Sequence, residues 1–250
     1  LHRLQPDYVT PYGVPKSEDV SAVLNRVFGY LDSVTPTGFI NEKTGEPLTD
    51  LLKIDENTIL ARGDFRIVSY EWGVTYAGML LAAEATGDPK FRDYTEKRLT
   101  FIADSADKFK KNTGKYSDWE ARMPLRNLIA PRALDDCGAM CAAMIKAKRA
   151  GSKADLQSLI DTAINHIMNK QYRLSDGTLA RNRPQANTLW LDDLFMGVPA
   201  VAQMGKLTDD KKYFDEAAKQ VLAFEKRMFN REKGVFMHGW VEGMTDHPEF

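Results

Sequence analysis

Three segments of the chain share one pattern, and this repeat is the feature that most limits the fold. Each segment opens with acidic or aromatic residues, continues as a run of small apolar residues, and reaches a glycine fifteen residues after its opening group. The pairs of opening residue and glycine are Trp72 and Gly87, Asp136 and Gly151, and Trp190 and Gly205. Glycine readily adopts the left-handed conformation that ends many α-helices. The repeat therefore predicts three buried helices, over residues 70–86, 132–150 and 190–204.

A charged, amphipathic segment follows each buried one. These segments predict exposed helices over 89–110, 153–171 and 209–229, and an apolar stripe after Ser17 predicts a further helix over 17–33. The repeating unit is thus a buried helix plus an exposed helix, about 54–64 residues long. Such units either close into a ring, with the N-terminal ends of the buried helices at one mouth, or stack into an open solenoid. The repeat is compatible with both arrangements.

The connections are less regular. Residues 34–68 are rich in Gly, Pro, Thr and Asn, which predicts a long connection with a short strand or hairpin. Further loops are expected over 111–130 and 172–188. Small residues on the buried helices, such as Ala82 and Ala139, would let these helices approach one another closely.

Composition excludes several classes of function. The 250 residues are 43% hydrophobic with a formal net charge of −1, and the Lys and Arg residues are scattered, so we expect a globular protein that does not bind nucleic acid. No apolar run approaches the length that crosses a membrane. Cys137 and Cys141 lie four residues apart on a predicted helix, which favours buried free thiols over a disulfide. No Cys/His spacing resembles a metal site, and we expect neither metal nor cofactor.

Two adjacent carboxylates, Asp192 and Asp193, stand at the start of the third buried helix, directly after Trp190. Helix capping is one explanation, because Asp in a first turn accepts hydrogen bonds from free N–H groups and suits the helix dipole. However, ionised Asp is seldom buried unless it is paired or takes part in chemistry. Asp136 occupies the corresponding start of the second buried helix, so the arrangement favours a pocket for a sugar or another polar ring.

The same residues carry a resemblance to a known family. The segments are SYEWGVTYAGMLLAAEATGD, ALDDCGAM and TLWLDDLFMGVP, followed by HGW. Over residues 65–245 the chain resembles glycoside hydrolase family 105, the unsaturated rhamnogalacturonyl hydrolases, and its relative family 88, the unsaturated glucuronyl hydrolases. The resemblance implies an all-α fold, the (α/α)6 barrel of twelve helices. The seven or eight helices expected here predict a single domain over residues 1–250 that lacks the C-terminal helices of this barrel.

The resemblance also implies roles for individual residues. Asp192 matches the general acid/base, and Asp136 matches a partner aspartate on a neighbouring buried helix. Asp193 stands where many relatives have Gly, which leaves open which of Asp192 and Asp193 is the acid. The residues expected to bind substrate are Tyr70, Trp72, Trp190, His238 and Trp240. Without the resemblance, the residue types favour a place in the hydrophobic core for the tryptophans and a structural role for His238.

The implied substrate is an oligosaccharide with a Δ4,5-unsaturated uronic acid at its non-reducing end, left by a lyase acting on pectin. An acid protonates C4, water adds at C5, and the resulting hemiketal opens. The acid must keep its proton near neutral pH, so we expect burial beside Trp190 and the charge of Asp136 to raise the pKa of Asp192. Alternatives are a glucuronyl hydrolase acting on glycosaminoglycan or ulvan fragments, and a helical-repeat scaffold without activity.

Overall fold

The computed structural model describes residues 14–244. Residues 1–13 and 245–250, which we expect in the same domain, lie outside the described part. The long helices are α1 (Ser17–Val34), α2 (Tyr70–Thr86), α3 (Pro89–Lys111), α6 (Leu134–Arg149), α7 (Gln157–Asn165), α8 (Leu191–Thr208) and α9 (Lys211–Met228). The short ones are η1 (Leu51–Lys53), η2 (Thr113–Lys115), α4 (Trp119–Arg122), α5 (Arg126–Ile129) and η3 (His166–Lys170), the last a π-helical turn. The all-α prediction is confirmed, and the predicted long helices are present within a few residues of their expected bounds.

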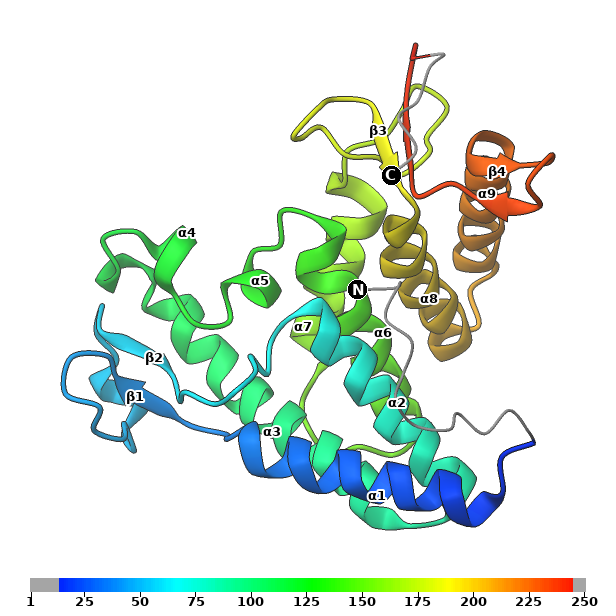
Figure 1. Ribbon diagram of the computed structural model, residues 1–250. Helices are drawn as coiled ribbons and strands as arrows, with labels where there is room; N and C mark the ends of the chain where they lie inside the picture. Colours follow the sequence, from blue (N-terminus) through cyan, green and yellow to red (C-terminus); the bar gives the residue numbers. More distant parts are fainter. Residues whose placement is uncertain (1–13, 245–250) are drawn as a thin grey trace, which may run out of the picture.

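The helices form an inner and an outer layer. In Figure 1, α2, α6 and α8 lie side by side at the centre, with α6 between the other two. Helix α3 packs on α2, α7 on α6, and α9 on α8. Each outer helix brings the chain back to the end of the molecule at which the preceding inner helix began. The three inner helices therefore run in the same direction and start at the same end. None of the helices within residues 14–244 is long and apolar enough to cross a membrane.

Two glycines bring the inner helices into backbone contact. A Cβ added at Gly73 of α2 would lie 2.3 Å from the carbonyl carbon of Ala139 on α6. A Cβ added at Gly138 of α6 would lie 1.9 Å from the carbonyl oxygen of Met196 on α8. Neither distance is possible for real atoms, so only glycine fits at both places. The expected close approach is therefore present, and it depends on glycine as well as on the predicted alanines.

The three glycines of the repeat do not all end helices. Gly87 adopts a φ of 71° and caps α2, and Gly151, with a φ of 87°, follows the end of α6. Gly205 instead lies inside α8, which continues to Thr208 and ends at Asp209 with a φ of 56°. A Cβ at Gly205 would lie 2.9 Å from the ring of Phe214. The prediction that this helix ends at Gly205 was wrong. The glycine does not end the helix there; its missing side chain leaves room for the ring of Phe214 on α9.

Three short antiparallel ribbons complete the structure. Strands β1 (Phe39–Asn41) and β2 (Thr58–Leu60) form the hairpin expected within 34–68. Strands β4 (Phe229–Asn230) and β5 (Val235–Phe236) form a second hairpin, and β3 (Thr188–Trp190) pairs with β6 (Gly239–Val241). The β3–β6 pair joins segments about 50 residues apart and was not predicted. The predicted loop over 111–130 contains the short turns η2, α4 and α5.

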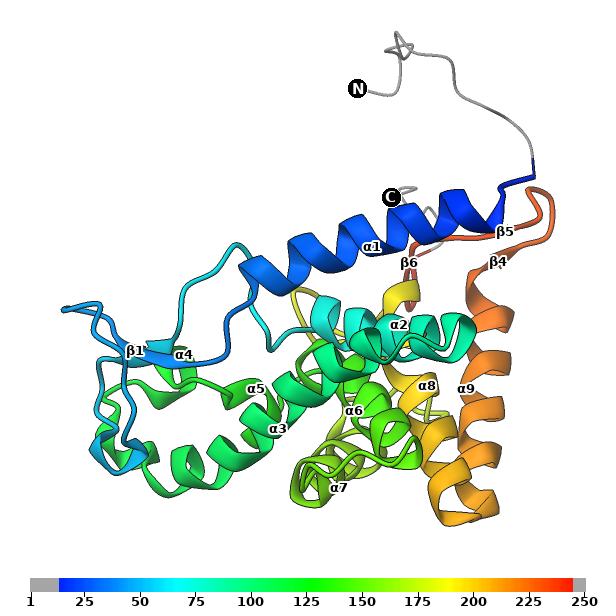
Figure 2. The ribbon, with the colours of Figure 1, turned by 90° about the horizontal axis from the view of Figure 1, so that it is seen from below.

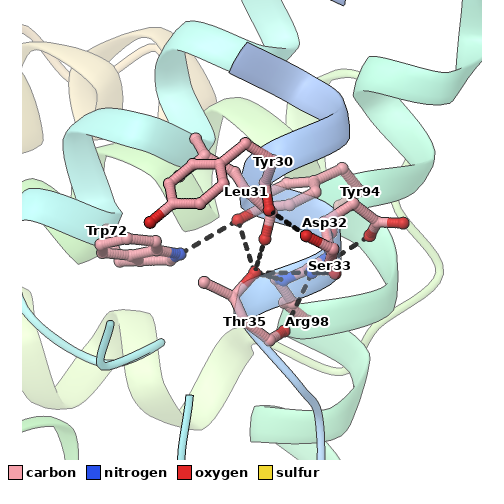
Figure 3. Close-up of polar contacts among 8 residues, drawn as sticks. All are labelled: Tyr30, Leu31, Asp32, Ser33, Thr35, Trp72, Tyr94 and Arg98. Atoms are coloured by element: carbon pink, nitrogen blue, oxygen red, sulfur yellow. Dashed lines mark hydrogen bonds and ion pairs between the residues drawn. The ribbon is translucent and has the colours of Figure 1, made fainter. Parts of the chain in front are cut away.

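Helix α1 lies outside the two layers, and a buried arginine holds its C-terminal end. Figure 2 shows α1 on the opposite side of α2 and α3 from α7. Arg98 of α3 is fully buried and donates to the carbonyl and hydroxyl oxygens of Thr35, at 2.9 and 2.7 Å, and to Asp32 at 3.1 Å (Figure 3). Its guanidinium also lies 3.5 Å from the ring centre of Tyr94. Because a buried cation is tolerated only with such partners, this cluster fixes the segment that leaves α1.

Cys137 and Cys141 are free and buried on α6, as predicted. Burial raises the pKa of both thiols. The two residues therefore behave as small apolar side chains of the core.

Candidate active site

The starts of α2, α6 and α8 lie close enough for their charges to interact. The charge of Glu71 raises the pKa of Tyr70 above its ordinary value, and the more distant charges of Asp135 and Asp192 add to this effect. These residues belong to the first turns of the three inner helices. The first turns of α6 and α8 are also joined through Arg181, which pairs with Asp135 and Asp193.

The β3–β6 ladder brings His238 to the start of α8. Trp190 pairs with Gly239, and the backbone N–H of Leu191 donates to the carbonyl of His238 at 2.8 Å. The imidazole Nε2 then lies 3.3 Å from a carboxylate oxygen of Asp192, and the ring contacts that of Trp190 edge-on at 5.8 Å between centres. Trp190, Asp192 and His238 thus form one cluster, which we call the Asp192 cluster.

A cavity of about 540 Å³ opens beside the Asp192 cluster. Asp192 and His238 line one part of it, and Lys233, Val235 and Phe236 of the β4–β5 hairpin line another. The side chains of Asp192 and His238 are 49% and 50% exposed, so both can meet a ligand. The sequence-based expectation that Asp192 is buried was wrong; the adjacent Asp193 is the buried carboxylate, with 2% exposure.

Arg181 neutralises Asp193. Its guanidinium donates to both oxygens of Asp193, at 2.6 and 2.9 Å, and to both oxygens of Asp135, at 3.2 and 3.0 Å. The guanidinium also lies 4.1 Å from the ring centre of Trp190. Burial raises the pKa of Asp193, while Arg181 opposes this shift by favouring the carboxylate. A pair of backbone hydrogen bonds with Thr188 holds Arg181 in place. Asp193 is thus fully engaged in an internal ion pair, which leaves Asp192 as the carboxylate that faces the cavity.

The two aspartates of α6 point in different directions. Asp135 shares Arg181 with Asp193 and is 36% exposed. Asp136 accepts from Arg126 and from the backbone N–H of Arg132, both at 2.8 Å, and is 13% exposed. Asp135, rather than the expected Asp136, is therefore the carboxylate of α6 that the structure joins to the start of α8.

The remaining aromatic candidates lie in different surroundings. Tyr70 is 43% exposed, whereas Trp72 is 6% exposed and donates its indole N–H to Tyr94 at 3.2 Å. Trp240 pairs with Leu189 one position along the ladder from Trp190, so its side chain points to the opposite face of the ribbon. There its ring lies 5.4 Å from the guanidinium of Arg227. The structure thus brings Tyr70 and Trp190 near the carboxylates, but not Trp72 or Trp240.

Sequence reasoning did not identify Arg181 or Asp135 as site residues. The contacts of Arg181 join it to residues 12 and 46 positions away along the chain. A signal was present, because an acidic pair at the start of a buried helix needs a cation. Within residues 14–244 no group of three or more His, Cys, Asp or Glu side chains could hold a metal ion.

Comparison with known proteins decides the family. The sequence profile of Glycosyl Hydrolase Family 88 matches residues 50–250. The chain belongs to this family. No curated protein matches the chain. The family 88 assignment agrees with the resemblance noted in the sequence, and it makes the chain part of a carbohydrate hydrolase family.

Solved structures show the same fold as this family 88 chain. A possible member of family GH105 from Klebsiella pneumoniae is 18% identical, with a TM-score of 0.61, and the match covers 96% of this chain and 55% of that one. A possible GH105 member from Salmonella enterica is 18% identical, with a TM-score of 0.59, and the match covers 96% of this chain and 56% of that one. A family 105 glycoside hydrolase from C. acetobutylicum is 22% identical, with a TM-score of 0.51, and the match covers 71% of this chain and 44% of that one. The family 88 chain therefore spans about half the length of the structures it matches.

Proposed function

We propose that this chain carries the acid–base groups of a glycosidase that removes a Δ4,5-unsaturated uronic acid from the non-reducing end of lyase-generated pectin or rhamnogalacturonan fragments. The observation that supports this most directly is Asp192, a half-exposed carboxyl beside His238 in a cavity large enough for a sugar ring. Membership of family 88 agrees with a carbohydrate substrate.

The proposed reaction needs one proton donor and one water molecule. The Asp192 carboxyl transfers its proton to C4 of the C4=C5 double bond, and positive charge develops at C5 and the ring oxygen. Water adds at C5 and returns a proton to the Asp192 carboxylate. The hemiketal that forms then opens and releases the remaining oligosaccharide. Atoms and charge balance without a covalent enzyme intermediate.

The surroundings of Asp192 suit this role once a sugar is bound. A sugar ring that fills the cavity would exclude water from around the Asp192 carboxyl and so strengthen the interactions of this group with the substrate. His238, at 3.3 Å, is placed to bind the carboxylate after proton transfer and to orient the water.

Asp135 takes the part expected of Asp136 in this proposal. Asp135 is partly exposed and adjoins the start of α8 through Arg181, whereas Asp136 is held by Arg126. The proposed carboxylate pair is thus Asp192 as acid and Asp135 as the group that tunes it or binds a sugar hydroxyl. Tyr70 and Trp190 are proposed to contact the sugar.

The test is loss of the ultraviolet absorbance of the conjugated uronate on an unsaturated disaccharide. Asp192→Asn should lower turnover by at least about 10²-fold, because positioned acid–base groups typically contribute that much. Asp135→Asn should impair turnover more than Asp136→Asn, and Asp107→Asn, on the exposed face of α3, is the control. Near wild-type turnover by Asp192→Asn would refute the assignment. Unchanged absorbance with pectin, chondroitin and ulvan lyase products alike would favour a scaffold without activity, and turnover of only the last two would favour a glucuronyl hydrolase.

A further inference from the structure

A second hollow is lined by the segment that precedes α2 and by the region of α4 and α5. This groove, of about 830 Å³, runs between residues 59–68 and residues 120–127. Arg126 lines it and also holds Asp136 at the start of α6, so the groove reaches the end of the inner layer where the candidate active site lies. The proposed reaction uses none of the groove residues.

Two arginines of the groove are available to a ligand. Of the four that line it, Arg122 pairs with Glu42 at 2.7 Å and Arg126 pairs with Asp136 at 2.8 Å. Arg62 and Arg66 are exposed and form no ion pair with any described residue. The charge of Arg66 also acts on Glu71 of α2, where it adds to the hydrogen bonds that lower the pKa of that carboxyl. Two of the groove acids are in ion pairs, Glu42 with Arg122 and Glu120 with Arg132, while Asp64 accepts a hydrogen bond from the neutral hydroxyl of Tyr30 at 2.9 Å and keeps its negative charge. The groove charges outside these ion pairs are therefore those of Arg62, Arg66 and Asp64, and the positive charges outnumber the negative one.

An aromatic ring stands between these arginines in the sequence. Phe65 lines the groove and is 41% exposed. Its other face rests on the buried Trp72, with ring centres 5.0 Å apart and planes at 30°. An exposed ring of this kind offers a flat apolar surface, and sugar rings present C–H groups that pack on such surfaces. Guanidinium groups bind carboxylates with paired hydrogen bonds.

The segment 62–66 is held in place. A Cβ at Gly63 would lie 2.2 Å from the carbonyl oxygen of Val34, and the N–H of Asp64 donates to the same oxygen at 3.1 Å. Val34 ends α1 and precedes Thr35, which the buried Arg98 binds (Figure 3). The groove arginines are thus carried on a backbone that the core positions, which lowers the entropic cost of binding a ligand.

We propose that this groove binds the uronate residues of an acidic oligosaccharide, beyond the sugar that is removed. Arg62 and Arg66 bind carboxylates, and Phe65 supports a sugar ring between them. This proposal rests on the proposed function for the location of the reacting end, but binding to the groove does not require the reaction. It predicts that longer acidic oligosaccharides bind more tightly than a disaccharide and that added salt weakens the difference.

The test measures binding rather than turnover. A saturated hexagalacturonate, which lacks the reacting double bond, is titrated calorimetrically into the full chain at low salt. The double variant Arg62→Gln/Arg66→Gln should weaken binding at least about 10-fold, as expected for the loss of two charge-assisted contacts. Arg26→Gln, on the exposed side of α1, is the matched control and should bind as the wild type does. Phe65→Leu should weaken hexagalacturonate and a neutral hexasaccharide alike.

Several results would overturn the proposal. The first is a double variant that binds hexagalacturonate as tightly as the wild type does. The second is a double variant that loses as much affinity for the neutral hexasaccharide as for hexagalacturonate. The third is wild-type protein that binds inorganic phosphate as tightly as it binds hexagalacturonate. Disaccharide turnover separates this proposal from the proposed function. If Asp192→Asn keeps its activity while binding still depends on the arginines, only the proposed reaction fails. If the double variant binds hexagalacturonate as the wild type does while Asp192→Asn is inactive, only the groove proposal fails.

Discussion

Replacing Arg181 with Met would leave the buried carboxylate of Asp193 without its counter-ion. Removing one partner of a buried ion pair typically costs about 3–5 kcal/mol. The Asp193 side chain is 3% exposed, but that of Arg181 is 17% exposed, so the pair is not fully dry. We therefore expect Arg181→Met to lower the free energy of unfolding by about 3 kcal/mol, at the lower end of that range.

Urea unfolding followed by circular dichroism measures this cost. With an m value of about 3 kcal/mol/M, the transition midpoint would fall by roughly 1 M. Asp193→Asn, which removes the charge from the other partner, completes a double-mutant cycle with Arg181→Met. Because the two side chains are in direct contact, the cycle should show a coupling energy of about 1–3 kcal/mol.

The pH dependence provides a second check. Without Arg181, burial acts unopposed and raises the pKa of Asp193 further above its unfolded value, near 4. For a carboxyl group with a raised pKa, stability is lost as pH rises from the unfolded value through the folded one. The cost of Arg181→Met should therefore be smaller at pH 5 than at pH 8. A cost below about 1 kcal/mol that adds to that of Asp193→Asn and does not change with pH would refute the reasoning.

Two further predictions concern the packing of the inner layer and a buried histidine. Gly138→Ala should destabilise the protein by at least about 2 kcal/mol in urea unfolding, because its Cβ would overlap the α8 backbone. Gly78→Ala, whose Cβ meets nothing within 4 Å, should instead stabilise the protein by about 0.5–1 kcal/mol. Equal effects of the two substitutions would contradict the packing argument. Burial lowers the pKa of His166, whose Nδ1 has no hydrogen-bond partner among the described residues. As pH falls, the histidine of the unfolded chain therefore takes up a proton before His166 of the folded protein does. The free energy of unfolding should fall as pH drops from about 6.5 through the folded pKa, by about 1.4 kcal/mol for each pH unit between the two pKa values. The variant His166→Gln should lack this loss, and identical pH profiles for variant and wild type would contradict the prediction.

The helix pattern could be predicted because each helix carries its own local signals. Ser69 and Asp88 accept hydrogen bonds from the first turns of α2 and α3, Pro89 opens α3, and Gly87 caps α2. Such features depend on neighbours a few residues away and are legible in the sequence. Gly205 shows the limit of this reasoning, since glycine serves close packing as readily as it ends a helix.

The candidate site was predictable as a region but not as a set of contacts. Asp135 and Asp136 are adjacent, yet successive residues on a helix point about 100° apart, so the packing of α6 decides which one meets α8. The same applies to Asp192 and Asp193, of which one faces the cavity and the other is buried.

The amino-acid order by itself determined the alternation of buried and exposed helices, their approximate positions, and the acidic residues at the starts of two inner helices. Only the tertiary structure decided which carboxylates meet Arg181 and His238, because those contacts join residues up to 46 positions apart. Periodicity reports which face of a helix is apolar, whereas a hydrogen bond between two distant segments depends on the rotation and separation of both, which no local pattern encodes.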